Sequence, residues 1–64
     1  MKERIRKTFG FIRAAGKDKR NLTKTGKLKP AQAAAVVEFL AALRSRDEKR
    51  IDRAIGQVNE KLEY

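Results

Sequence analysis

Two helical patterns lie in the stretch from Pro30 to Leu62, PAQAAAVVEFLAALRSRDEKRIDRAIGQVNEKL, and together they specify the fold. Pro30 suits the first turn of a helix, because a backbone N–H at that position would have no hydrogen-bond partner within the helix. The residues that follow, up to 43, are nearly all good helix formers. Five large apolar side chains then cover an arc of about 160°. They are Val36, Val37, Phe39, Leu40 and Leu43. So wide an apolar surface needs more than one neighbour, and we expect residues 30–44 to form the central core helix, with Leu40 at its centre.

A second helix is expected over residues 46–62. Ser45 and Glu48 form an S-x-x-E capping box, which predicts a helix start at Ser45. Apolar residues then recur at helical spacing within an arc of about 60°. They are Ile51, Ile55, Val58 and Leu62. The short link between the two helices makes them antiparallel neighbours. The predicted fold class is therefore all-α, built on an antiparallel helical hairpin of residues 30–44 and 46–62.

The N-terminal third allows two alternatives. As an amphipathic helix over residues 2–15, it has one apolar face. That face consists of Ile5, Phe9 and Ile12. As a short β-ribbon, residues 8–12, which have strand-like composition, pair with a second strand at 22–28. We prefer the helix, although Gly10 lies in its middle, and we expect the polar stretch from 16 to 29 to form a loop.

The net charge is concentrated in the first half of the chain. The 64 residues include 17 Lys plus Arg and 8 Asp plus Glu, a net charge of +9. Residues 1–29 hold eleven basic and two acidic side chains, whereas residues 30–64 hold six of each. We expect a single small domain, 1–64, in which 1–29 is a basic nucleic-acid-contacting segment and 30–64 is a neutral helical hairpin core. This asymmetry predicts a polyanionic partner.

The candidate contact residues are cations of the basic segment. Residues 17–29 hold six cations in thirteen positions, mostly Lys, which acts as a point charge and suits phosphates better than base edges. Binding should therefore be salt-sensitive and weakly sequence-selective. The nine candidates are Arg4, Arg6, Arg13, Lys17, Lys19, Arg20, Lys24, Lys27 and Lys29. We expect a small nucleic-acid-binding protein, DNA favoured over RNA, with an accessory or regulatory role. The alternatives are an inhibitor or adaptor that binds an acidic protein, and a merely solubilising charged segment.

Composition disfavours several other classes of protein. The chain has no Cys and no His, which removes disulfides, the usual zinc sites and the usual general base near neutral pH. No nucleophile–base pair is visible, and we expect neither an enzyme nor a cofactor. The acidic residues near 47–52 match no metal loop.

Size and hydropathy bear on assembly and location. The longest apolar stretch, 31–43, is shorter than the ~20 residues that cross a bilayer. The first fifteen residues contain no apolar segment of the kind found in secretory signals. We therefore expect no membrane association and a cytoplasmic location. A domain this small without disulfides or metals often gains core by self-association, so we also expect a homodimer.

Residues 7–12, KTFGFI, followed by Gly16 and Asp18, resemble the first ribonucleoprotein motif of cold-shock domains. The resemblance implies a strand on which Phe9 and Phe11 stack on bases of single-stranded nucleic acid. That family's second aromatic motif is absent, and the residues before Pro30 are too few for a five-stranded barrel. We therefore expect Phe9 to belong to the core.

A strand before two helices also resembles ribbon-helix-helix repressors, in which a dimeric ribbon enters the DNA major groove. The resemblance implies a ribbon over residues 22–28, with Thr23, Thr25 and Lys27 facing bases. Gly26 and the weak alternation of apolar residues depart from that pattern.

Overall fold

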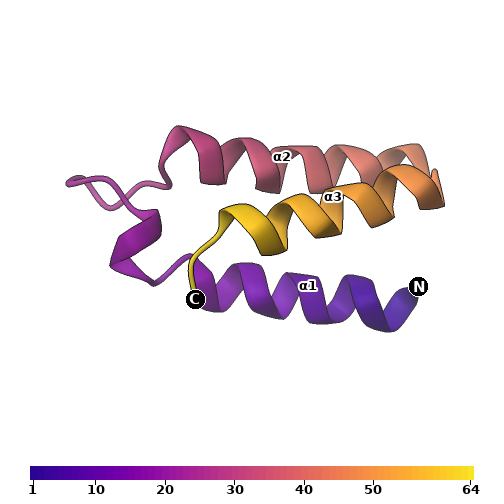
Figure 1. The fold of residues 1–64 in the computed structure, drawn as a ribbon, viewed down its shortest axis with the longest axis horizontal. Helices are drawn as coiled ribbons and strands as arrows, with labels where there is room; N and C mark the ends of the chain where they lie inside the picture. Colours follow the sequence, from indigo (N-terminus) through magenta and orange to yellow (C-terminus); the bar gives the residue numbers. More distant parts are fainter.

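Three α-helices make up most of the molecule. The computed structural model describes residues 1–64, with α1 at Lys2–Ala15, α2 at Pro30–Ser45 and α3 at Glu48–Lys61. A short 3-10 turn, Lys19–Asn21, lies between α1 and α2. In Figure 1, α2 and α3 run side by side, and α1 lies along the other side of α3. The expected all-helical class is confirmed, since the only β pairing is an isolated bridge between Leu22 and Leu28.

The hairpin forms as expected, but its turn lies later than the sequence suggested. The prediction that a helix starts at Ser45 is wrong, because α2 continues through this residue and its hydroxyl donates to the Ala42 carbonyl at 2.7 Å. Arg46 then adopts the left-handed conformation, with φ 57°, and ends α2. Asp47 is the N-cap of α3, and its Oδ1 accepts from the N–H groups of Lys49 at 3.0 Å and Arg50 at 3.4 Å. A carboxylate at this position also faces the positive end of the helix.

The core lies mainly between α2 and α3. Its nine buried apolar residues are Ala15, Ala35, Phe39, Ala42, Ile51, Ala54, Ile55, Val58 and Leu62. The expectation that Leu40 lies at the centre is wrong, because Leu40 is 45% exposed and Phe39 is fully buried. Successive helix residues point 100° apart, and α2 turns the face of Phe39 and its two alanine neighbours toward α3. The small alanines let the two helices approach closely.

The N-terminal segment is a helix and not a strand. α1 buries Thr8 and Ala15, and three half-buried side chains pack against the core. They are Ile5, Phe11 and Ile12. Phe9, expected in the core, is instead 41% exposed and touches the edge of Phe39, with ring centroids 5.2 Å apart. Because Phe9 and Phe11 stand on a helix, they do not form the strand platform that the cold-shock resemblance implied.

Candidate nucleic-acid interface

The basic loop, which we define as residues 16–29, lies at one end of the molecule, between the end of α1 and the start of α2 (Figure 1). Six of the nine candidate cations belong to it. They are Lys17, Lys19, Arg20, Lys24, Lys27 and Lys29. Arg13 lies in the last turn of α1, close to the loop in sequence. Arg4 and Arg6 lie in the first half of α1, toward the opposite end. The structure therefore groups most of the candidates but not all of them.

The tip of the basic loop is a hydrogen-bonded turn. The Thr23 N–H donates to the Lys27 carbonyl at 2.7 Å, and the Gly26 N–H donates to the Thr23 carbonyl at 3.0 Å. Gly26 has φ 80°, a left-handed conformation that glycine adopts without a steric penalty. This is the pattern of a short hairpin turn closed by a left-handed glycine. It presents Lys24 at the tip and Lys27 just after it, on backbone that is already ordered.

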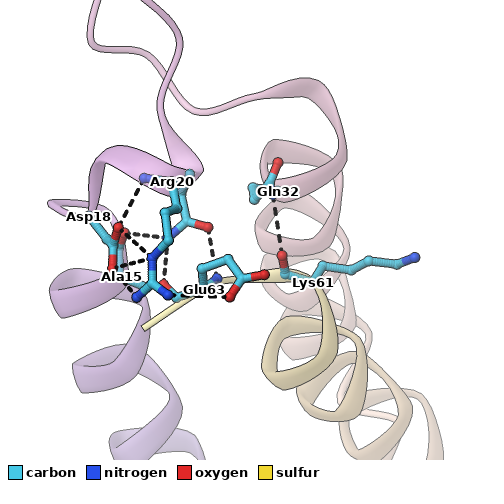
Figure 2. Close-up of polar contacts among 7 residues, drawn as sticks. Ala15, Asp18, Arg20, Gln32, Lys61 and Glu63 are labelled. Carbon is cyan, nitrogen blue, oxygen red and sulfur yellow. Dashed lines mark hydrogen bonds and ion pairs between the residues drawn. The ribbon is translucent and has the colours of Figure 1, made fainter.

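A buried amide fixes the base of the loop. Asn21 is fully buried, and its Nδ2 donates to the carbonyls of Ala15 at 2.7 Å and Glu63 at 2.6 Å. Its Oδ1 accepts from the Glu63 N–H at 2.8 Å, and its own carbonyl accepts from the Lys29 N–H at 2.9 Å. Figure 2 shows this region, where the loop meets the end of α1 and the C-terminal segment. Asn21 therefore joins three segments, and we call these contacts the Asn21 joint.

The importance of Asn21 was missed at the level of sequence. A single asparagine in a Lys-rich loop lies on no periodic apolar face, and its partners are backbone groups of residues 15 and 63. Only the folded chain brings those groups together. Nothing in the local pattern distinguishes this buried amide from an ordinary turn asparagine.

Arg20 is held by carboxylates of its own chain. Its Nη2 lies 2.6 Å from Asp18 Oδ2, and its Nε donates to both Asp18 oxygens. Asp18 Oδ1 also caps the 3-10 turn by accepting from the Arg20 backbone N–H at 2.9 Å. The side-chain hydrogen bonds from Arg20, followed by the bond from its backbone N–H, lower the pKa of Asp18 to about 2. The same side-chain bonds raise the pKa of Arg20. A second carboxylate oxygen, Glu63 Oε2, lies 3.7 Å from Arg20 Nη1. Arg20 therefore serves chiefly to hold the loop.

Arg4 is neutralised in a similar way. Its Nη1 lies 2.5 Å from Asp52 Oδ1, an exposed ion pair that joins α1 to α3. The sequence could not show this pairing, because the two residues are far apart along the chain and meet only when the helices pack. Of the nine candidates, Arg4 and Arg20 are thus the two engaged by carboxylates.

Seven candidates remain exposed and form no ion pair with a carboxylate. They are Arg6, Arg13, Lys17, Lys19, Lys24, Lys27 and Lys29. Five of these are lysines of the basic loop. Because Asp18 and Arg20 cancel each other, the loop carries a net charge of +5 on fourteen residues. Such a density of unpaired charge at one end of a small molecule attracts anions.

No group of three or more acidic, Cys or His side chains is placed to hold a metal ion. None of the helices combines the length and the apolar content that crossing a membrane requires. Comparison with protein-family models, with curated proteins and with solved structures found no significant match to this chain.

Proposed function

We propose that this protein binds nucleic acid through the basic loop, mainly by contacts to the phosphate backbone. The observation that carries the proposal is that five loop lysines are exposed and free of ion pairs, whereas Arg20 of the same loop is used internally. Duplex DNA is favoured over RNA as the target. Phosphate contacts of this kind carry little sequence information, which fits an accessory or regulatory role.

The construction of the loop favours binding of an extended polyanion. Each lysine that neutralises a phosphate releases a condensed counterion, and this release drives association. The hydrogen-bonded turn at Thr23–Gly26 and the Asn21 joint order the backbone before binding, which lowers the entropy lost on association. Arg13, in the last turn of α1, adds a charge near the base of the loop.

The test compares two variants that lose the same charge at different places. One carries Lys24→Gln, Lys27→Gln and Lys29→Gln in the basic loop. The control carries three substitutions on α3, each of an exposed cation without an ion pair. They are Lys49→Gln, Arg53→Gln and Lys61→Gln. Fluorescence anisotropy with labelled duplex and single-stranded oligonucleotides at low salt measures the affinity of each protein.

The proposal predicts that the loop variant loses about 30-fold or more in affinity, since three phosphate contacts disappear. The α3 control should lose less than about 3-fold, because long-range attraction between exposed charges is screened by salt. Equal losses in the two variants would show that total charge matters and not the loop. Wild-type protein that binds no oligonucleotide at low salt, but binds polyglutamate, would overturn the proposal in favour of an acidic protein partner.

A further inference from the structure

The side of α2 that points away from α3 is apolar and uncovered. It consists of side chains at helical intervals of three and four residues, which we call the outer stripe. Its members are Pro30, Ala33, Val37, Leu40 and Arg44. At 100° per residue these positions fall within about 80° of arc, the a/d pattern of a helix–helix seam. Val37 is 63% exposed and Leu40 is 45% exposed, and a shallow groove lined by Val37, Leu40, Ala41, Leu43 and Arg44 runs beside them.

A helix that is apolar on nearly every side is normally covered on every side. In this structure α3 covers one side of α2, and the ring of Phe9 on α1 contacts that of Phe39. The accessible surface of the chain is 4965 Å². A compact monomer of 7.3 kDa is expected to expose about 4200 Å². The chain therefore exposes about 800 Å² more than a compact monomer of its mass, and the exposed side chains of Val37 and Leu40 are part of that surface.

We infer that the outer stripe is the contact surface for a second copy of this chain, paired α2 to α2 in antiparallel orientation. The excess positive charge of the chain lies in residues 1–29, whereas α2 carries only Glu38 and Arg44 as charged residues. Glu38 is already bound to Arg50 at 2.9 Å, and its pKa is lowered by that hydrogen bond. With Arg44 as its one charged member, the stripe offers a polyanion far less than the basic loop does, whereas a second copy offers a surface of matching polarity.

Self-pairing also requires that the surface complement itself across a two-fold axis. The first half of the outer stripe is small, ending at Ala33, and the second half is large, with Val37 and Leu40. An antiparallel pair brings the large central residues of the two helices together and sets the small Ala33 end of each helix against the Arg44 end of the other. With the axis between positions 37 and 40, Val37 of one copy packs against Leu40 of the other, and the Arg44 stem lies over Ala33.

Charge selects the antiparallel orientation over the parallel one. A parallel pair would bring the two basic loops, each with a net charge of +5, to the same end. An antiparallel pair separates them by the length of α2, whose 16 residues span about 24 Å. That distance exceeds the Debye length of about 8 Å at physiological ionic strength, so the repulsion is largely screened. The inference is independent of nucleic-acid binding, and its tests contain no nucleic acid.

Sedimentation equilibrium over a wide concentration range tests the pairing. Wild-type protein should approach twice the 7.3 kDa chain mass, and more completely at high salt, because repulsion between copies of charge +9 is screened. Leu40→Glu should remain at the chain mass with unchanged helical circular dichroism, since Leu40 is 45% exposed and lies outside the buried core. Gln57→Glu changes the charge by the same amount on exposed α3 and should still pair. A wild-type protein that stays at the chain mass up to millimolar concentration, or a Leu40→Glu variant that pairs normally, would overturn the inference.

Disulfide trapping tests the orientation, because the chain contains no cysteine of its own. In the antiparallel pair, position 37 of each copy lies within about 5 Å of its counterpart along the helix axis, whereas the two positions 33 lie about 16 Å apart. Val37→Cys should therefore cross-link with itself on oxidation, and Ala33→Cys should not. A mixture of Ala33→Cys and Arg44→Cys should give a mixed dimer. Efficient self-cross-linking of Ala33→Cys would contradict the antiparallel arrangement.

Discussion

Two regions of the molecule, the α2–α3 hairpin and the basic loop, are held in place by different forces. The α2–α3 hairpin is held by apolar packing around Phe39 and Val58, both fully buried. The basic loop contributes no buried apolar residue, and its position depends on hydrogen bonds of Asn21 and Asp18. A segment dense in lysine has too little apolar surface to bury, so its order must come from polar groups. A cationic loop can therefore be ordered by polar contacts without a core of its own.

The largest expected effect concerns two neighbouring residues of α2. Phe39→Ala should destabilise the protein by about 3–5 kcal/mol, because it empties the centre of the core. Leu40→Ala should cost less than about 1 kcal/mol at low protein concentration, since that side chain is half exposed. Urea unfolding followed by circular dichroism measures both. Similar losses in the two variants would mean that the hairpin core is not centred on Phe39.

The next largest effect concerns the Asn21 joint at the base of the basic loop. Asn21→Ala removes three side-chain hydrogen bonds and leaves buried backbone partners unpaired, so it should cost roughly 3 kcal/mol. Asn59→Ala, at an exposed asparagine on α3, is the matched control and should cost less than about 0.5 kcal/mol. Amide exchange at Glu63 and Lys29 should quicken only in the Asn21 variant. If both variants unfold at the wild-type urea concentration, the Asn21 joint does not hold the loop.

A smaller effect distinguishes the two capping candidates at the hairpin turn. Asp47→Ala should cost about 1 kcal/mol, because it removes the acceptor for two N–H groups at the start of α3. Ser45→Ala should lower the free energy of unfolding by only about 0.3 kcal/mol, since the Ser45 hydroxyl bonds a carbonyl within α2. Thermal melting of the two variants decides between the caps. A greater loss from the serine variant would restore Ser45 as the cap of α3.

The smallest effect is a pH dependence of stability that arises from Asp18 in the basic loop. The pKa of Asp18 falls from 3.8 to about 2 on folding, because the Arg20 guanidinium and N–H bind its carboxylate. A lowered folded-state pKa adds stability above the unfolded pKa, and that stability is lost as the pH falls from about 4 to about 2. The melting temperature of Asp18→Asn should therefore vary less than that of wild type across this window. Identical pH profiles would show that the exposed pair contributes nothing to stability.

The hairpin was predictable because its apolar residues repeat with the helical period in both arms. The rotation of α2 was not, since a helix that is apolar on nearly all sides does not reveal whether Phe39 or Leu40 faces the core. Helix caps were ambiguous for a related reason, because Ser45 and Asp47 are both good capping residues.

The candidate interface was predictable in composition but not in detail. Local charge counting finds the basic loop, since the excess of lysine is visible without any structure. It cannot tell that Arg4 pairs with Asp52 or that Arg20 is shared between Asp18 and Glu63, because two of these carboxylates come from α3 and the C-terminal segment. Ion pairs between distant segments therefore distinguish the cations that stabilise the fold from those that remain free to bind an anion.

The proposal that the unpaired lysines of the basic loop neutralise phosphates is tested by the salt dependence of duplex DNA binding. A plot of the logarithm of the association constant against the logarithm of the salt concentration should have a slope of about −4 to −5 for wild-type protein, since each of the five loop lysines neutralises one phosphate. The variant with Gln at positions 24, 27 and 29 should give a slope shallower by about 3, at an unchanged melting temperature. Equal slopes for the two proteins would contradict the claim.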